Sequence, residues 1–433
     1  MNELRMFLLS AVWALSVVPA TAQTENSIDW RRVFTEPRLA QLIETALEHN
    51  ADLRTANLNV EQAEAQLRAA RLAFLPSLSI NAEGNIQKTK GVDAQKTYNV
   101  PLTMQWELDL AGRLRGEKRS AVARYLSTAE TERATKVQII ATVASSYYTL
   151  VMLDRQLEIT RQNAENLRQT VETMEAMKEV GMQNEAAVSQ ARAAWLSVAA
   201  QEKTMMQQVK ATENSLTVLV GTELGSIERS ASDDIQLAFV PATSYPLTTL
   251  ANRPDVKANE YALKAQMAQV DVARAAFYPQ LTITASAGWT NNVGQIVNPG
   301  QILLNAVSSL VQPLFNRGLN RANLRSAKVQ QEQALVAFNQ SLLVAGAELS
   351  DALTACQLSL ERLKLRTDEV AAAQRAYEVS QDLMHNGSST YLEVLTAQQS
   401  LLQSQLSIVQ DRLDFVQGKI NLFKALGGEI CQQ

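Results

Sequence analysis

The sequence is poor in the residues that most catalytic and metal-binding sites require. Its 433 residues include two cysteines and two histidines, His49 and His385, which lie far apart in the chain. No nucleophile elbow, phosphate-binding loop or dinucleotide-binding glycine motif occurs. The paired carboxylates of Asp233 and Asp234 fall in a polar stretch that is typical of a solvated linker. We therefore expect no catalytic residue, no metal ion and no cofactor, and the chain is not expected to be an enzyme.

Basic clusters and frequent chain breakers are also missing. The 40 Lys and Arg residues are scattered and are outnumbered by 44 Asp and Glu, so no basic stripe for nucleic acid is expected. Hydrophobic residues make up 46% of the chain, which excludes a disordered protein. Only 16 glycines and 10 prolines interrupt the sequence, and this scarcity favours long, continuous helices.

The two cysteines give little reason to expect a disulfide. Cys356 lies in the middle of a helical pattern and Cys431 lies near the last residue, so a buried thiol is the favoured interpretation of Cys356. Neither cysteine follows the N-terminal leader, and no N-terminal lipidation is therefore predicted.

The N-terminal segment has the pattern of a secretory signal peptide. Residues 1–22 contain Arg5, an apolar run and a small-residue cleavage pattern, which places cleavage between Ala22 and Gln23. The alternative is a membrane anchor, but the run is shorter than the roughly 20 residues that a spanning helix needs. No later stretch has 18 uncharged apolar residues, so no other helix is expected to cross a bilayer.

An internal two-fold repeat organises the rest of the chain. "RLAFLPSLSI" at 71–80 returns as "RAAFYPQLTI" at 274–283, which is 203 residues later. Three pairs of glycines then match at an offset of 206 residues: Gly112 with Gly318, Gly181 with Gly387, and Gly221 with Gly427.

Each half is predicted to contain a helix, two strands, a very long helix, a short turn and a final helix. The first repeat, 23–220, comprises helix 38–75, strands 77–88 and 97–110, long helix 114–180 and helix 185–220. The second repeat, 248–426, comprises helix 248–276, strands 280–291 and 303–315, long helix 319–386 and helix 391–426. Segments 221–247 and 427–433 connect and end the repeats. The long helices, of about 67 residues, would extend about 100 Å and indicate a bundle or tube.

The predicted strands alternate between apolar and polar residues. Tyr98, Trp106 and Trp289 lie on the apolar faces, where aromatic residues would meet a membrane interface. The strand near 303–315 alternates less cleanly. A soluble, half-buried sheet remains an alternative. If the strands are in a membrane, four cannot close a barrel, so several chains must share one.

The turn "HNGSSTYLEVL" shows how the second long helix is expected to end. Asn386 and Gly387 supply a left-handed stop, and Thr390 with Glu393 is predicted to form a capping box for the next helix.

Several stretches together resemble a known family. "WELDLAGRLR" (106–115), "LANRPDVKANEYALKAQMAQVDVARAAFYPQLTITASAG" (250–288), "QPLFNRGLNRANLRSAKVQQEQALVAF" (312–338) and "KALGG" (424–428) are similar to the TolC-like outer membrane factors of tripartite multidrug efflux pumps, especially the NodT-type branch. The resemblance implies a mixed α and β membrane protein of the Gram-negative outer membrane. It further implies a homotrimer whose three sets of four strands form a twelve-stranded β-barrel, continued through the periplasm by a long-helix α-barrel. Segments 221–247 and 427–433 would form an equatorial belt.

The resemblance also implies partners and a gate. A periplasmic adaptor protein would contact the turns at Gly181, Met182, Gly387 and Ser388, and an inner-membrane transporter of the resistance-nodulation-division (RND) type would complete the pump. Relatives often carry "YLxxLDAQR" at the gate, whereas this chain has "YLEVLTAQQ". The candidate gate residues are Leu392, Glu393, Thr396 and Gln399, with neutral side chains at the two positions that relatives fill with Asp and Arg. We expect a Leu392 ring and neutral hydrogen bonds to close the pore, and Glu393 to serve mainly in the capping box.

Two alternatives for the function stay open at this point. One is a periplasmic coiled-coil adaptor or scaffold, although an adaptor would have one helical hairpin and more short strands. The other is the outer-membrane channel of a type I secretion system. The exported substrate is not indicated by any residue pattern.

Overall fold

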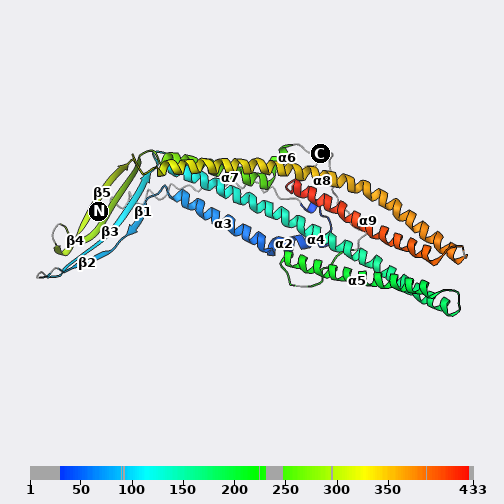
Figure 1. Ribbon diagram of the computed structural model, residues 1–433. Coiled ribbons are helices and arrows are strands. Elements are labelled where there is room, and N and C mark those ends of the chain that lie inside the picture. Colours follow the sequence, from blue (N-terminus) through cyan, green and yellow to red (C-terminus); the bar gives the residue numbers. More distant parts are fainter. Residues whose placement is uncertain are drawn as a thin grey trace.

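The computed structural model is an elongated molecule with a sheet at one end and helical hairpins extending to the other (Figure 1). It describes residues 30–88, 90, 93–223, 225–230, 247–293, 296–386 and 388–428. The predicted signal peptide, its cleavage site at Ala22 and Gln23, Gly387, Cys431 and most of the 221–247 segment lie outside these residues.

Two helices of 67 residues form the long axis of the molecule, α4 (Arg113–Glu179) and α8 (Leu319–His385). Each begins after a glycine in the left-handed conformation, Gly112 and Gly318, both with φ of 80°. Because neither helix contains a proline, nothing interrupts its backbone hydrogen bonds, and each extends about 100 Å.

Two helices that were predicted as single each consist of two helices in the structure. The structure has η1 (Trp30–Arg32), α2 (Pro37–His49), α3 (Ala51–Leu72), α5 (Glu185–Val220), α6 (Leu247–Asn252), α7 (Pro254–Ala275) and α9 (Tyr391–Ala425). The single helices predicted at 38–75 and 248–276 are wrong, because each is broken. Asn50 is extended and its side chain caps α3 through the backbone N–H of Leu53, at 3.0 Å. Arg253 is held extended by the Pro254 that follows it.

The strands form one antiparallel sheet: β1 (Ser77–Ile80), β2 (Glu83–Gln87), β3 (Gln95–Leu108), β4 (Gln280–Asn292) and β5 (Ile296–Val311). β3 pairs with β4, β4 pairs with β5, and β1 and β2 both pair with β3. The strand predicted at 77–88 is therefore two pieces. The break lies opposite Pro101 of β3, which has no N–H to donate to a neighbouring strand.

The fourth strand is shifted from its predicted position of 303–315, since β5 covers Ile296–Val311. The strand was predicted in the wrong place because its apolar and polar residues do not alternate strictly. Leu303 and Val307 are apolar, although they lie on the face opposite that of Leu304 and Leu310. Ser308 likewise pairs with Ile283 on the otherwise apolar face.

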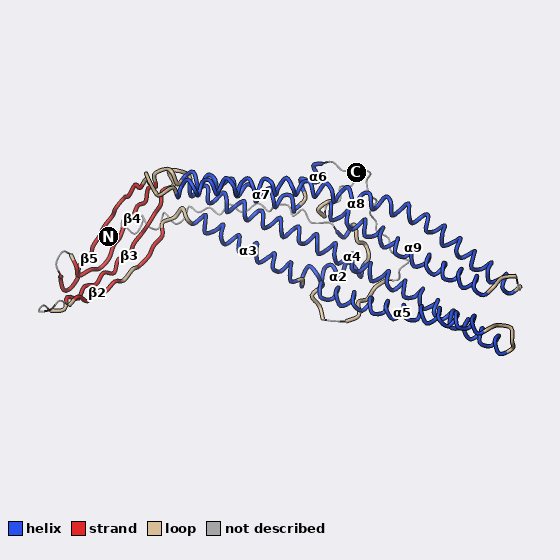
Figure 2. Tube along the Cα trace, in the orientation of Figure 1, coloured by secondary structure: helices blue, strands red, loops and turns tan. Residues whose placement is uncertain are grey.

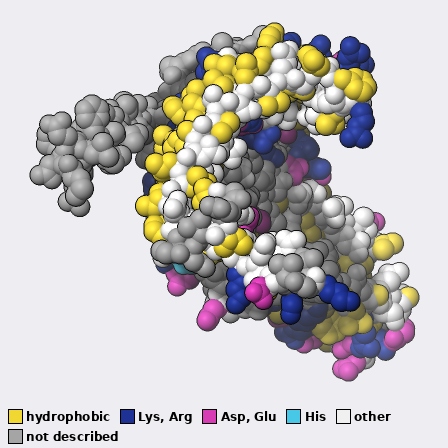
Figure 3. All heavy atoms as spheres, turned by 90° about the vertical axis from the view of Figure 1, so that its left-hand side faces the viewer, with side chains coloured by type: hydrophobic (Ala, Val, Ile, Leu, Met, Phe, Trp, Pro, Cys, Tyr) yellow, Lys and Arg dark blue, Asp and Glu magenta, His cyan; other side chains and the backbone are white. Residues whose placement is uncertain are grey.

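The sheet presents one apolar face and one mainly polar face. The register brings the apolar side chains of all the long strands to the same side, because directly opposed residues of antiparallel strands share a face. Exposed members of this face are Leu78, Ile80, Leu102, Ile302, Leu304 and Leu310. Seen from the strand end, hydrophobic side chains gather along the outer edge of a curved arc (Figure 3).

The largest core lies midway along the molecule, where α2 meets α4, α5 and α9. Phe34 and Phe423 pack edge to face with ring centroids 5.4 Å apart. Tyr147 of α4 is buried here and donates to the carboxylate of Glu36, and burial together with Glu36 raises the pKa of Tyr147 to about 12.

One window of α4 is long and apolar enough to cross a membrane, but 61% of it is buried in the molecule. Cys356 is also buried in this core, as predicted.

Midway along the molecule, corresponding positions of the two halves make corresponding contacts. Asn50 Nδ2 donates to the carbonyl of Leu219 at 2.8 Å, and Arg253 Nη1 donates to the carbonyl of Ala425 at 3.1 Å. Both bonds join the start of a strand-side helix to the end of a hairpin helix. In the second half the donor is a charged guanidinium, and Arg253 also pairs with Asp255 and Glu348. Burial acts to raise the pKa of Asp255, but the hydrogen bonds and charge of Arg253 outweigh it and lower that pKa.

Gly221 and Gly181 offer a matched test of this packing. Both are left-handed, with φ of 79° and 74°, but a Cβ on Gly221 would lie 2.7 Å from the carbonyl oxygen of His49, whereas Gly181 has open space. We expect Gly181→Ala to cost about 1–2 kcal/mol from backbone strain alone, and Gly221→Ala to cost clearly more. Thermal unfolding of the two variants measures the difference, and equal losses would contradict the close approach.

Candidate pore constriction and hairpin tips

Two helical hairpins, α4–α5 and α8–α9, end side by side at the far end from the sheet (Figures 1 and 2). In the first turn Gly181 is left-handed, and the N–H of Met182 bonds to the carbonyl of Met177 at 2.8 Å. In the second turn the N–H of Ser388 bonds to the carbonyl of Leu383, also at 2.8 Å, while Gly387 lies outside the described residues. Met182 and Ser388 are exposed at the two tips.

The predicted capping box at the start of α9 is wrong. The hydroxyl of Thr390 does not cap the backbone of α9 in the described structure, and the N–H of Glu393 bonds to the backbone carbonyl of Thr390 at 3.1 Å. The carboxylate of Glu393 instead accepts hydrogen bonds from the hydroxyls of Ser389 and Thr390. Two successive hydroxyls before the helix thus compete for the carboxylate that a capping box needs.

The first turns of α9 have one buried and one exposed face. Tyr391, Leu395 and Leu402 pack into a core cluster with α4 and α5, which fixes how the two hairpins lie against each other. Leu392, 56% exposed, points away from this cluster. The side chains at 391, 395 and 402 share one face because they are spaced by multiples of a helical turn.

Three of the four candidate gate residues lie together. Leu392, Glu393 and Thr396 line one side of a groove of about 390 Å³ between α8 and α9, and small residues of α8, Ala373 and Ala376, line the other side. The hydroxyl of Thr396 donates to the carbonyl of Leu392 within its own helix, at 2.8 Å. Gln399 is exposed but does not line this groove.

The hydroxyl of Tyr391 is buried without a hydrogen-bond partner in the part of the chain that the structure describes. Burial, with a smaller effect from Tyr377, raises the pKa of Tyr391, so the phenol stays neutral at ordinary pH. An unpaired buried hydroxyl costs free energy. In this conformation of the hairpin tip, the residue next to Leu392 therefore buries a hydroxyl whose hydrogen bond to water is not replaced.

A charged cluster joins α8 to α9 about halfway along their hairpin. Asp411 is 5% exposed and accepts from Arg362 at 2.6 Å and from Arg366 at 2.9 Å. The equivalent pair in the first hairpin is neutral, since Thr160 donates to the sulfur of Met205 at 3.2 Å. This difference was not predicted from the sequence, although Arg362 and Arg366 are one helical turn apart.

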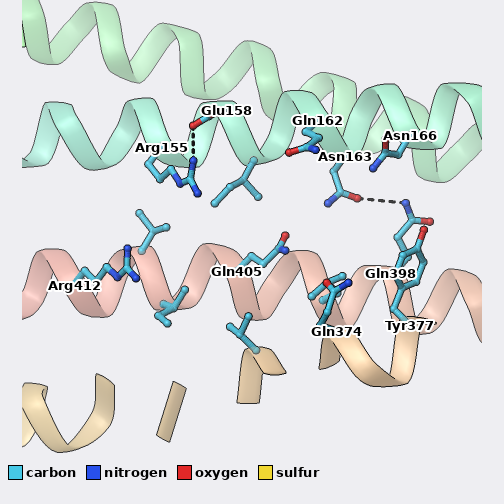
Figure 4. Close-up of a pocket in the computed structure, with 15 residues that line it drawn as sticks. Arg155, Glu158, Gln162, Asn163, Asn166, Gln374, Tyr377, Gln398, Gln405 and Arg412 are labelled. Atoms are coloured by element: carbon cyan, nitrogen blue, oxygen red, sulfur yellow. Dashed lines mark hydrogen bonds and ion pairs between the residues drawn. The ribbon is translucent and has the colours of Figure 1, made fainter. Parts of the chain in front are cut away.

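The two hairpins meet across a polar groove of about 470 Å³ (Figure 4). Its walls come from α4, α8 and α9 and carry the amides Gln162, Asn163, Asn166, Gln374, Gln398 and Gln405. Asn163 and Gln398 are 9% and 5% exposed and approach to 3.4 Å, which is a long hydrogen bond. This pair was not predicted from the sequence, because Asn163 and Gln398 lie 235 residues apart and have no local pattern.

In residues 30–428, apart from the gaps given above, no group of three or more His, Cys, Asp or Glu is placed to hold a metal ion.

The buried amide pair can be tested with a double-mutant cycle. Gln398→Leu alone leaves the Asn163 amide buried and unpaired, which should cost roughly 1–3 kcal/mol. The combined change Asn163→Leu with Gln398→Leu should recover most of this loss, because two apolar side chains then meet beside Ile159 and Leu401. Unfolding temperatures of the single and double variants measure the coupling, and strictly additive losses would show that the pair is not coupled.

Comparison with known proteins identifies the family. The family model described as outer membrane efflux protein matches residues 42–222 and 246–428. The probable efflux pump outer membrane protein TtgC of Pseudomonas putida is 32% identical over 411 residues, covering 92% of this chain and 84% of TtgC. The cation efflux system protein CusC of Escherichia coli O157:H7 is 29% identical and covers 94% and 89%. A crystal structure of CusC superposes with a TM-score of 0.85 at 28% identity, covering 92% and 94%.

These matches favour an outer-membrane channel over a periplasmic scaffold, and they extend over both halves of the chain. The chain therefore belongs to the outer membrane efflux protein family and is a channel subunit of an efflux pump in the Gram-negative outer membrane.

Proposed function

We propose that three copies of this chain form a passive duct that carries drugs or other small molecules out of the periplasm. The observation that carries this proposal is the open sheet. It has an apolar face for lipid, but among the described residues no further strand pairs with the outer edge of β1 and β2 on one side or of β5 on the other. Unpaired backbone groups cannot remain in hydrocarbon. Pairing β5 of one copy with β1 and β2 of the next closes a barrel of twelve strands, counting β1 and β2 as one broken strand.

The aromatic residues support a membrane position for this sheet. Trp289 Nε1 donates to the Tyr98 hydroxyl at 3.2 Å near the outer end, and Trp106 Nε1 donates to the Phe74 carbonyl at 2.9 Å near the helices. Tyr98 and Trp106 share the apolar face of β3 and are eight residues apart, which corresponds to about 26 Å of strand. An apolar band about 25 Å tall with aromatic residues at both borders is typical of outer-membrane barrels.

The helices support the same closure. α3 packs on α4, α4 on α7 and α7 on α8, so α3 and α8 are the two ends of one helical layer. Large apolar side chains of α8 are exposed in the single chain, among them Leu343 at 70% and Leu365 at 71%. A neighbouring copy would cover them, and the helices would continue the barrel as a tube through the periplasm.

The matched contacts support an origin of the two halves by duplication. Asn50 with Leu219 and Arg253 with Ala425 occupy positions that correspond at the offsets of the predicted repeat. Gly112 and Gly318 share a φ of 80°, and Gly221 and Gly427 are both left-handed.

At the far end of the tube, the gate is assigned to the exposed face of α9. A ring of Leu392 from three copies would narrow the pore, with Thr396 and Gln399 as neutral neighbours and Glu393 as the charged one. The tips at Gly181, Met182, Gly387 and Ser388 are the proposed contacts for a periplasmic adaptor, and an RND-type transporter would complete the pump. Relatives are named for toluene, antibiotic and cation efflux, so the family name alone does not select one substrate.

The assembly is tested directly by purifying the full chain in detergent. We expect a trimer by mass and ion-conducting pores after insertion into a planar bilayer. Recovery of the chain as a monomer in the soluble periplasmic fraction would overturn the proposal.

Leu392→Ala tests the gate. Removing three apolar side chains from the narrowest point should raise single-channel conductance several-fold, because less of the pore is closed to water and ions. Leu196→Ala is the matched control, since Leu196 is 53% exposed on α5 and outside the proposed constriction. A conductance of Leu392→Ala equal to that of the control would rule out this gate.

A further inference from the structure

A large basic groove lies where the helices meet the sheet. It has a volume of about 1140 Å³ and is lined by α4 and α7, which belong to the same copy. Five basic side chains and one acidic side chain line it: Arg115, Lys118, Arg119, Lys264, Arg274 and Asp271. Ligand pockets of proteins commonly have roughly 300–1,000 Å³, so the groove has room for a small polar group and part of a chain attached to it.

Fewer acidic than basic side chains lie near the groove, so the groove keeps a net positive charge. Asp271 pairs with Arg119 at 3.0 Å and with Arg274 at 3.4 Å, and Arg115 pairs with Asp109 at 3.0 Å.

Its two lysines have aromatic neighbours. Lys118 lies over the ring of Phe74, 6.0 Å from its centroid. Lys264 lies 4.8 Å from the ring of Tyr261 and pairs with Glu260. A basic groove with aromatic walls offers both charge and apolar contact to one ligand.

The sheet shows which way the groove faces. Glu107, on the polar face of β3, pairs with Arg113 of α4 at 2.5 Å, and Arg113 pairs with Glu117 one turn further along. This side of α4 therefore continues the polar face of the sheet. Lys118 lies on the opposite side of the helix, because residues advance about 100° each around its axis.

Trp106 links the groove to the apolar face. Its side chain is on the apolar face of β3, and its Nε1 donates to the carbonyl of Phe74. The ring of the same Phe74 lies under Lys118. The groove thus opens on the same side as the apolar face, immediately beyond the aromatic border on the helix side.

We propose that this groove binds the phosphate headgroup of an anionic phospholipid from the inner leaflet of the outer membrane. The inference rests on the proposed function, because the apolar face must lie in lipid for the groove to reach headgroup level. Charge complementarity selects the occupant, since basic pockets beside membrane-embedded segments hold anionic lipid headgroups. The lysines would contact the phosphate, and the aromatic rings would lie against the glycerol and the first acyl carbons.

The experiment counts lipids on the intact trimer. The full chain is reconstituted in nanodiscs that contain phosphatidylglycerol and phosphatidylcholine, released into the mass spectrometer, and scored for each retained lipid. We expect the wild type to prefer phosphatidylglycerol. Lys118→Gln combined with Lys264→Gln should weaken that preference by about tenfold or more, since each basic side chain near a membrane surface contributes measurably to anionic lipid binding.

Arg124→Gln is the matched control. Arg124 lies on the opposite side of α4, in a polar groove with Asn59 and Gln62, and it should not affect lipid retention. Unchanged phosphatidylglycerol retention in the double lysine variant, or an equal loss in Arg124→Gln, would overturn the lipid site.

Conductance of every protein is recorded first. Conducting trimers without a preference for phosphatidylglycerol overturn this inference alone, whereas failure to form conducting trimers overturns the proposed function.

Discussion

The pairing of backbone groups in lipid is the constraint on which the remaining architecture depends. A sheet with the strand order β1-β3-β4-β5 and an apolar face has two free edges, and neither edge can remain open in hydrocarbon. The break opposite Pro101 interrupts the ladder between two strands, and Asn81 spans it by donating to the Pro101 carbonyl at 3.3 Å. In the proposed trimer, closing this sheet between copies would set the number of strands, the curvature of the helical layer and the arrangement of the hairpin tips at the other end.

Much of this molecule can be predicted from residue patterns, because its elements are long and regular. The 67-residue helices follow from the scarcity of proline and glycine, and the glycine pairs mark their ends. The errors have local causes. Asn50 interrupts a helix without an obvious breaker at its own position, whereas at Arg253 the signal of the following Pro254 was overlooked. β5 is apolar on both faces, with Leu303 and Val307 opposite Leu304 and Leu310, which hides its register.

The candidate site is harder to predict, since its contacts join residues that are distant in sequence. Leu392 and Thr396 could be placed by their position in a motif, but the groove that they share with Ala373 depends on how α8 crosses α9. The amide pair of Asn163 and Gln398 joins opposite halves of the chain and has no signature of its own. The predicted capping box failed because the alternative hydrogen bonds to Ser389 and Thr390 are equally local.

The two hairpins, which occupy corresponding places in the fold, differ in one contact between their helices. Thr160 and Met205 form a neutral contact, whereas Arg362 and Arg366 hold Asp411 by charge. The range of electrostatic attraction falls from about 30 Å at 0.01 M salt to about 3 Å at 1 M. The first hairpin has ion pairs of its own between its helices, Arg161 with Glu202 and, near the tip, Arg192 with Glu175 and Lys178 with Glu185. Because salt screens exposed charges much more than buried ones, it weakens the exposed pairs near this tip more than the pair at the buried Asp411. Added salt therefore loosens the tip of the first hairpin before it loosens the middle of the second.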